Sequence, residues 1–108
     1  MTESKETKED KIKALKDYQN SLVNMENLNI LDDDFKTILS LIKDNPCIRG
    51  IDLKLNNISD KGVKHLIDFL NVNKTIVFMD LWGNRISKRG DRLLIKLREQ
   101  HTQIVFNF

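Results

Sequence analysis

Apolar residues recur along this chain of 108 residues with a period of 28. Eight residues of the stretch 48–69 reappear, as the same or a similar type, 28 positions later. The first set is Ile48, Ile51, Leu53, Asn56, Ile58, Gly62, Leu66 and Phe69, and the second is Ile76, Met79, Leu81, Asn84, Ile86, Gly90, Leu94 and Leu97. A fixed period of this size is typical of a repeat architecture, in which each period forms one supersecondary unit.

Each period predicts one short strand followed by one helix. Ile51 and Leu53 alternate with a polar residue, as expected of a strand with one buried face. Behind a capping Ser59, the next apolar residues follow the helical spacing i, i+3, i+4, i+7: Val63, Leu66, Ile67 and Leu70. The third period predicts a corresponding helix near residues 87–98.

Two weaker copies flank these periods. Residues 20–47 keep most of the apolar positions, but Leu28 replaces the asparagine and Asp34 replaces the glycine. We therefore expect the same unit with a distorted first turn. Residues 104–108 repeat the start of the third period, with Ile104 at the position of Ile76, and predict a fourth strand.

The first 19 residues predict a capping helix and not a further repeat. Residues 1–6 are polar and charged, and we expect them to be flexible. The stretch 7–19 opens on a capping-box pattern, formed by Thr7 and Asp10, and has one narrow apolar stripe. Such a helix would cover the open end of the core beside the first unit. A membrane-surface or secretion helix is the alternative, and the lack of Trp or Phe in the stripe argues against it.

These motifs resemble the leucine-rich repeat of the ribonuclease-inhibitor-like class. The matching pattern is Ile48-x-x-Ile51-x-Leu53-x-x-Asn56-x-Ile58, which recurs over residues 76–86, each time followed by Gly and a helix-period segment. The resemblance implies an α/β solenoid, a horseshoe segment with parallel strands on the concave face and helices outside. It would divide the chain into a flexible N-terminus with a capping helix, 1–19, and a repeat domain, 20–108, made of repeats 20–47, 48–75 and 76–103 and a terminal strand, 104–108.

In the implied fold, residues between the buried strand positions point into the concave face. Trp82 takes the slot of Lys54 there, and Phe78, Phe106 and Phe108 would lie near it. Large aromatic residues exposed together mark a contact surface. Alternatively, Phe106 and Phe108 fold over the open end of the core as a cap. The predicted partner-binding residues are Asn24, Glu26, Asp52, Lys54, Phe78, Asp80, Trp82, Phe106 and Phe108, with Gly50 and Leu55 beside them.

Asp52 and Asp80 would occupy the same position of successive strands, about 5 Å apart. Paired carboxylates serve acid–base or metal chemistry in some proteins. Aspartate at this slot also resembles the usual Leu-Asp-Leu motif of the repeat class, however. We therefore expect the two carboxylates to receive a Lys or Arg of a partner, and not to carry out catalysis.

The sequence shows no motif for catalysis, a cofactor or a metal. No glycine-rich phosphate loop follows a strand, and Cys47 has no neighbouring histidine. The three aspartates at 32–34 start a helix. A calcium loop starting there would need Gly and Glu where Thr37 and Lys43 stand. We therefore expect no enzyme and no cofactor.

Composition and charge limit the class of partner and the compartment. A net charge of +2 is too small to indicate nucleic acid or a membrane by itself. The last helix is basic, with Lys88, Arg89 and Arg92 near its start, which usually means a solvated face. One cysteine fits a reducing compartment. Because neither a long apolar run nor a Sec-type signal is present, we expect a cytoplasmic protein, or one secreted into a host cytosol by another route.

The resemblance also implies a class of function. Ribonuclease-inhibitor-like repeats often bind another protein on the concave face, sometimes blocking the active site of an enzyme. Short, cysteine-poor members occur among effectors that intracellular bacteria deliver into host cells. We therefore expect a protein-binding module of bacterial effector type that binds, and inhibits or regulates, a partner enzyme. The alternatives are an adaptor for a ubiquitin-ligase or host signalling complex and, less favoured, a nucleic-acid-binding module.

Overall fold

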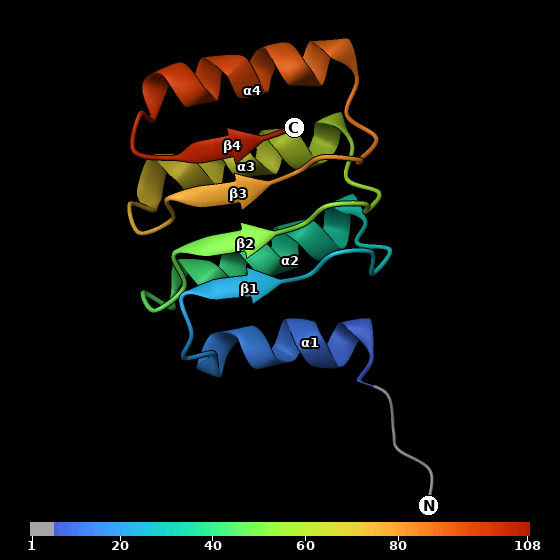
Figure 1. Ribbon diagram of the computed structural model, residues 1–108, viewed down its shortest axis with the longest axis vertical. Coiled ribbons are helices and arrows are strands. Elements are labelled where there is room, and N and C mark those ends of the chain that lie inside the picture. The colour runs from blue at the N-terminus through green and yellow to red at the C-terminus, as the bar shows by residue number, and fades with distance from the viewer. Residues whose placement is uncertain (1–5) are drawn as a thin grey trace, which may run out of the picture.

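A computed structural model describes residues 6–108, in which helices and strands alternate along the chain (Figure 1). The expected flexible segment lies outside the described residues, apart from Glu6. The predicted strand–helix periods and the fourth strand are confirmed. The elements are α1 (Lys8–Ala14), the 3-10 turn η1 (Leu15–Asp17), β1 (Leu22–Asn24), α2 (Asp32–Lys43), β2 (Gly50–Asp52), α3 (Asp60–Val72), β3 (Phe78–Asp80), α4 (Lys88–Gln100) and β4 (Val105–Asn107).

The four strands form one parallel sheet in the chain order β1, β2, β3, β4. In Figure 1 the sheet lies in front of α2 and α3, α1 lies beyond β1, and α4 lies beyond β4. Along the chain, α2 contacts α3 and α3 contacts α4. The helices α2 and α3 thus pack behind the sheet, and no helix of residues 6–108 covers its other face. This mixed α/β architecture with a parallel sheet confirms the α/β part of the predicted fold class.

The core lies between the sheet and the helices. The central residue of each strand is buried, and these residues stand in register: Val23, Ile51, Met79 and Phe106. The helices contribute fully buried residues at the same 28-residue interval: Ile38, Leu66 and Leu94. Alternate residues of a strand face opposite sides of a sheet. The first and third residues of each strand therefore point away from the core.

An asparagine in the turn after β2, and another in the turn after β3, connects each of these units to the unit before it. The side-chain oxygen of Asn56 accepts hydrogen bonds from the backbone N–H groups of Leu28 and Ile30, both at 2.9 Å. Its amide nitrogen donates to the backbone carbonyl of Met25 at 2.8 Å. Asn84 makes corresponding bonds one unit later. Since buried backbone groups need hydrogen-bond partners, asparagine at this position stabilises the stacking of the units.

The first turn is distorted, as the absence of an asparagine at Leu28 predicted. Asn27, Leu55 and Gly83 occupy equivalent positions of the three turns, and all adopt left-handed backbone conformations, with φ of 55°, 58° and 76°. Asn29 adds a second left-handed residue, with φ of 54°, to the first turn alone. Asparagine tolerates this conformation better than most residues, so the extra residue is accommodated there.

The predicted capping helix covers the core beside β1. Its capping box is formed, because the Asp10 N–H donates to the Thr7 hydroxyl at 3.1 Å and the Thr7 N–H donates to the Asp10 carboxylate at 3.2 Å. Leu15 is buried under the sheet edge. The Tyr18 hydroxyl donates to the backbone carbonyl of Leu22 at 2.8 Å. The capping segment is thus joined to the first strand by both apolar and polar contacts.

The last strand is offset from the 28-residue period by one residue. β4 pairs Val105 with Phe78 and Phe106 with Met79. A slip of one residue exchanges the two faces of a strand. Phe106 therefore points into the core, where it is 6% exposed, and the prediction that it lies on the partner-binding face is wrong. Val105 takes the outward position.

Candidate functional site

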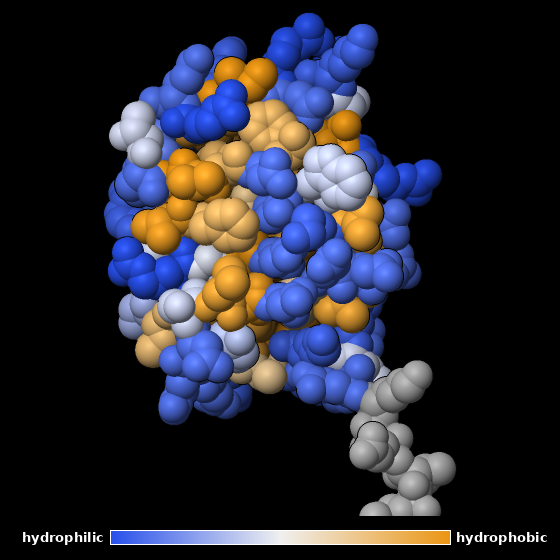
Figure 2. All heavy atoms as spheres, in the orientation of Figure 1, coloured by the Kyte–Doolittle hydropathy of each residue, from blue (hydrophilic) through white to orange (hydrophobic). Residues whose placement is uncertain are grey.

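The face of the sheet that points away from the helices carries two rows of side chains. The first residues of the four strands form the row that we call the apolar column: Leu22, Gly50, Phe78 and Val105. The third residues form the polar column: Asn24, Asp52, Asp80 and Asn107. Figure 2 shows this division, with an apolar patch over the amino ends of the strands and hydrophilic side chains over their carboxyl ends.

The apolar column is a continuous strip that the core does not require. Leu22 is 54% exposed and Val105 is 64% exposed, while Phe78 is half-buried. Because Gly50 has no side chain, the side chains of Leu22 and Phe78 approach each other over β2. A Cβ at this glycine would lie 3.2 Å from both Leu22 Cδ1 and Phe78 Cβ. A shallow apolar groove follows the same strand ends, with Val77 on its wall.

Leu22 and Val105 were missing from the residues predicted from the sequence. Leu22 could have been found, because it precedes the buried Val23 directly and is equivalent to Gly50 in the 28-residue period. Val105 had no such signal, because it depends on the shifted register of β4.

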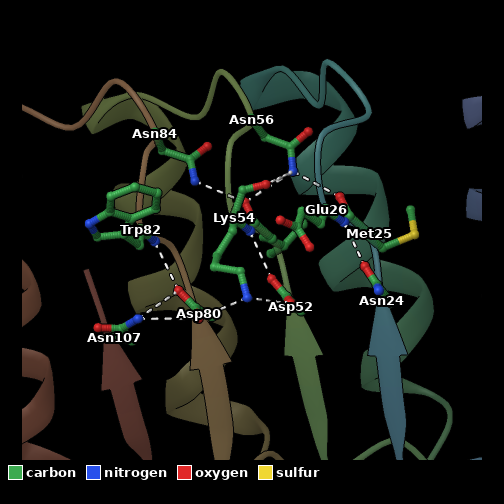
Figure 3. Close-up of polar contacts among 11 residues, drawn as sticks. Asn24, Met25, Glu26, Asp52, Lys54, Asn56, Asp80, Trp82, Asn84 and Asn107 are labelled. Carbon is green, nitrogen blue, oxygen red and sulfur yellow. Dashed lines mark hydrogen bonds and ion pairs between the residues drawn. The ribbon is translucent and has the colours of Figure 1, made fainter.

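The polar column has a structural role that the sequence interpretation missed. The side-chain oxygen of Asp80 accepts a hydrogen bond from the Trp82 backbone N–H at 3.0 Å (Figure 3). Asp52 and Asn24 accept the equivalent bonds, also at 3.0 Å, from the residues two positions later. Each is an Asx turn that bends the chain away from its strand. These positions therefore support the local fold in addition to facing the open side of the sheet.

Lys54 neutralises much of the charge that Asp52 and Asp80 place side by side. Its ammonium nitrogen lies 2.9 Å from a carboxylate oxygen of Asp52 and 3.7 Å from one of Asp80 (Figure 3). The hydrogen bond with Asp52 raises the pKa of Lys54, against some desolvation, and the charges of Glu26 and Asp80 raise it further. Asn107 donates to both oxygens of Asp80, at 3.1 and 3.2 Å.

The expectation that the two carboxylates await a cation from a partner therefore needs correction. Asp80 is buried and Asp52 is partly buried, and the chain's own lysine bridges them. With the half-buried Glu26, the group of three carboxylates and one ammonium still has a negative excess. A carboxylate that is paired with a lysine in this way is suited to electrostatic contacts more than to proton transfer.

Trp82 lies beyond the carboxyl end of β3 and is 52% exposed, as predicted. Leu55 is also exposed, and its backbone N–H donates to the Trp82 carbonyl at 2.9 Å. The Leu55 side chain covers Gly83, since a Cβ there would be 2.7 Å from Leu55 Cδ2. A leucine in the left-handed region costs roughly 1–2 kcal/mol, so this exposed residue is held against its local preference.

The four aromatic residues do not form the single cluster that the sequence predicted. Phe78 begins β3 in the apolar column, whereas Trp82 follows the other end of that strand. Phe106 is in the core. Phe108 packs against the core at the end of the stack, with the Arg98 guanidinium carbon 5.4 Å from its ring centre. The alternative role, in which Phe106 and Phe108 cover the end of the core, is the one that their positions support.

Other chemistry receives little support from the described residues. Within residues 6–108, no group of three His, Cys, Asp or Glu side chains is placed to hold a metal ion. In the same range, no helix has the length and apolar character needed to cross a membrane. Cys47 is a free, exposed cysteine.

Comparison with known proteins gives a structural likeness and no family. No protein-family model matches the chain, and no curated protein matches it. Among solved structures, the chain is similar to "Leiomodin-1 Actin-Binding Site 2 (ABS2)", with a TM-score of 0.77 and 18% sequence identity. The match covers 94% of this chain and 61% of that structure, so the chain spans about three fifths of its length. At this identity the likeness establishes a shared fold.

Proposed function

We propose that this chain is a leucine-rich-repeat module of the ribonuclease-inhibitor-like class that binds another protein on the open face of its sheet. The repeat class is supported by the 28-residue period and by the asparagines that join successive units. The observation that supports the proposed protein binding most directly is the exposed apolar column. Leu22 and Val105 are exposed on a sheet face that no helix of the described residues covers. Because position 50 is a glycine, the side chains of Leu22 and Phe78 can approach each other there.

Burial of this strip by a partner would favour association. Removal of apolar surface from water contributes about 25 cal/mol per Å², part of which offsets the entropy lost on binding. Trp82 and Leu55 offer a second apolar contact beyond the polar column. The polar column between them is held in place by Asx turns and by Lys54, so it would position a partner without needing to reorganise.

The structural neighbour supports protein binding only as a class. The similar structure is an actin-binding site, which is a site for another protein. We infer a protein partner for this chain on the same fold, and we do not transfer actin itself. The finer proposal, an effector-type protein that binds and inhibits or regulates an enzyme, rests on the resemblance of the repeats, their small number and the low cysteine content.

A pair of serine substitutions tests the proposed face. A partner captured with the unmodified chain is titrated by calorimetry against the Leu22→Ser/Val105→Ser variant. We expect its affinity to fall by about tenfold or more, because two exposed apolar contacts are lost. The matched control is Val72→Ser, since Val72 is 66% exposed but lies at the end of α3. Equal affinity of both variants for the partner would show that the sheet face is not the binding surface.

A further inference from the structure

The charge of this chain is distributed unevenly along the stack. Residues 20–47 contain five acidic and two basic residues, whereas residues 76–103 contain six basic and three acidic residues. The small net charge of +2 conceals this difference. The positive end of the stack therefore presents a field that the composition alone does not show.

Four exposed basic residues stand at equivalent positions of α3, in the preceding repeat, and of α4, at the positive end. Lys61 and Lys64 of α3 correspond, at the 28-residue interval, to Arg89 and Arg92 of α4, and all four are exposed. Residues three apart on a helix are about 5–6 Å apart, and neighbouring helices pack about 8–10 Å apart. We call this group of four the basic quartet.

The basic quartet is not neutralised within the part of the chain that the structure describes. None of its members forms a salt bridge among residues 6–108. Asp60 lies close enough for Arg89 and Lys64 to help lower its pKa, but the hydrogen bonds from Ser87 are the larger cause. Those bonds hold the carboxylate between α3 and α4, with the Ser87 N–H donating at 2.9 Å.

Two members of the quartet stand where local helix physics disfavours a positive charge. Lys61 and Arg89 are the second residues of α3 and α4, and Lys88 is the first residue of α4. Acidic residues are favourable in the first turn of a helix and basic ones are not. The first turn of α2 follows this rule with three aspartates, whereas α3 and α4 each have one acidic residue there, Asp60 and Asp91, beside the basic ones. A charge placed against local stability indicates that another interaction uses it.

We propose that the basic quartet is a second docking surface, which binds an acidic segment of a protein across the helix side of α3 and α4. In Figure 1, α3 lies behind the sheet and α4 lies beyond β4, so neither helix covers the open face of the sheet. Its size, about one helix turn on each of two adjacent helices, fits a short acidic helix. Arginine pairs well with carboxylates, which match its planar guanidinium.

The composition of the surface favours an acidic protein over nucleic acid. Asp68 is exposed one turn beyond Lys64, and Asp91 lies between Arg89 and Arg92. A polypeptide partner can place uncharged residues opposite these two aspartates, whereas the phosphate backbone of a nucleic acid would place negative charges there. The exposed positions of α3 and α4 also hold no aromatic residue on which bases would stack.

Charge reversal at two quartet positions tests the proposal. The probe is a fluorescein-labelled, glutamate-rich peptide of about 15 residues, long enough to form a helix, followed by anisotropy at low salt. Lys61→Glu/Arg89→Glu should weaken its binding by about tenfold. Lys13→Glu/Lys16→Glu makes the same change of net charge at exposed positions of α1 and η1 and should leave the peptide affinity within about twofold.

Further measurements separate the outcomes. Circular dichroism should show Lys61→Glu/Arg89→Glu folded, because acidic residues suit the first turn of α3 and α4. It should also show the control variant folded, because Lys13 and Lys16 are exposed. Lys61→Gln/Arg89→Gln should give an intermediate loss of peptide binding. Absence of peptide binding by the unmodified chain, or equal losses in the two reversed variants, would overturn the proposal. So would tighter binding of a DNA duplex of about 20 base pairs at the same salt concentration. The Leu22→Ser/Val105→Ser variant should bind the peptide normally, so failure of the sheet face and failure of the quartet are distinguishable.

Discussion

Replacement of Asn56 by alanine should destabilise the protein strongly, because one buried side chain closes the turn between two units. Asn56 is buried, and its side chain bonds to the N–H of Ile30 and to the carbonyls of Met25 and Leu53 in buried surroundings. The N–H of Leu28 and the carbonyl of Lys54 are its partly buried partners. Alanine supplies none of these bonds.

The size of the effect follows from the groups left without a partner. A buried polar group that loses its hydrogen bond costs about 1–3 kcal/mol. Asn56→Ala removes the side-chain partner of three buried groups: the Ile30 N–H and the carbonyls of Met25 and Leu53. Because a carbonyl can accept a second hydrogen bond, we use the lower end of this range and expect a loss of about 3 kcal/mol in the free energy of unfolding. For a small domain with an m-value near 2 kcal/mol per M, this lowers the urea midpoint by about 1.5 M.

The assay is urea unfolding followed by circular dichroism, and Asn57→Ala is its matched control. Asn57 is adjacent and only partly buried, and its side chain donates to Asn29 Oδ1 at 2.6 Å in exposed surroundings. We expect the control to lose about 0.5 kcal/mol. If Asn56→Ala lowers the urea midpoint no more than Asn57→Ala, the asparagine does not join the units in the way described.

Three further predictions concern the ends of the stack and the pH dependence of stability. Phe106→Ala should cost about 3–5 kcal/mol of unfolding free energy by opening a cavity, whereas Val105→Ala should cost under about 1 kcal/mol; equal losses in urea unfolding would contradict the register of β4. Tyr18→Phe should cost about 1 kcal/mol by removing the bond to the Leu22 carbonyl, and an unchanged thermal midpoint would show that this bond does not stabilise the capping segment. Burial of the Asp34 carboxyl group would raise its pKa, but the hydrogen bonds from Lys8 and Leu31 outweigh this desolvation, and the pKa is lowered from 3.8. The stability that the carboxylate contributes is therefore fully present above pH 3.8 and is lost as the pH falls through the lower pKa of the folded state. Unfolding free energy measured across this range should accordingly fall less steeply in Asp34→Asn, and identical slopes would show that the Lys8 contact is not formed in solution.

Local patterns in the sequence predicted most of the fold. The 28-residue period carried the apolar positions of strands and helices, and the capping box of Thr7 and Asp10 marked the first helix. Such signals are local or periodic, so they can be recognised in the sequence without knowledge of how the elements pack. The register of β4 could not be predicted from such a signal, because Ile104 keeps the 28-residue period whereas Phe106 departs from it by one residue. A shift of this kind is visible only once β3 is present as a pairing partner.

The candidate site was only partly predictable, for a related reason. The alternation of strand residues placed Asp52, Asp80 and Trp82 outside the core correctly. It could not show that Lys54 reaches sideways to both carboxylates, because the path of a long flexible side chain depends on neighbouring strands. The outward position of Val105 likewise depends on the register in which β4 pairs with β3.

The measurement that tests protein binding by the sheet most directly is an NMR titration of the labelled chain with its captured partner. Backbone and side-chain shifts report which residues the partner touches in the unmodified protein. The largest changes should fall on the apolar column and on the Trp82 indole, while the outer residues of α2 change little. Changes confined to the helices, with Leu22, Phe78 and Val105 undisturbed at saturation, would contradict binding on the open face of the sheet.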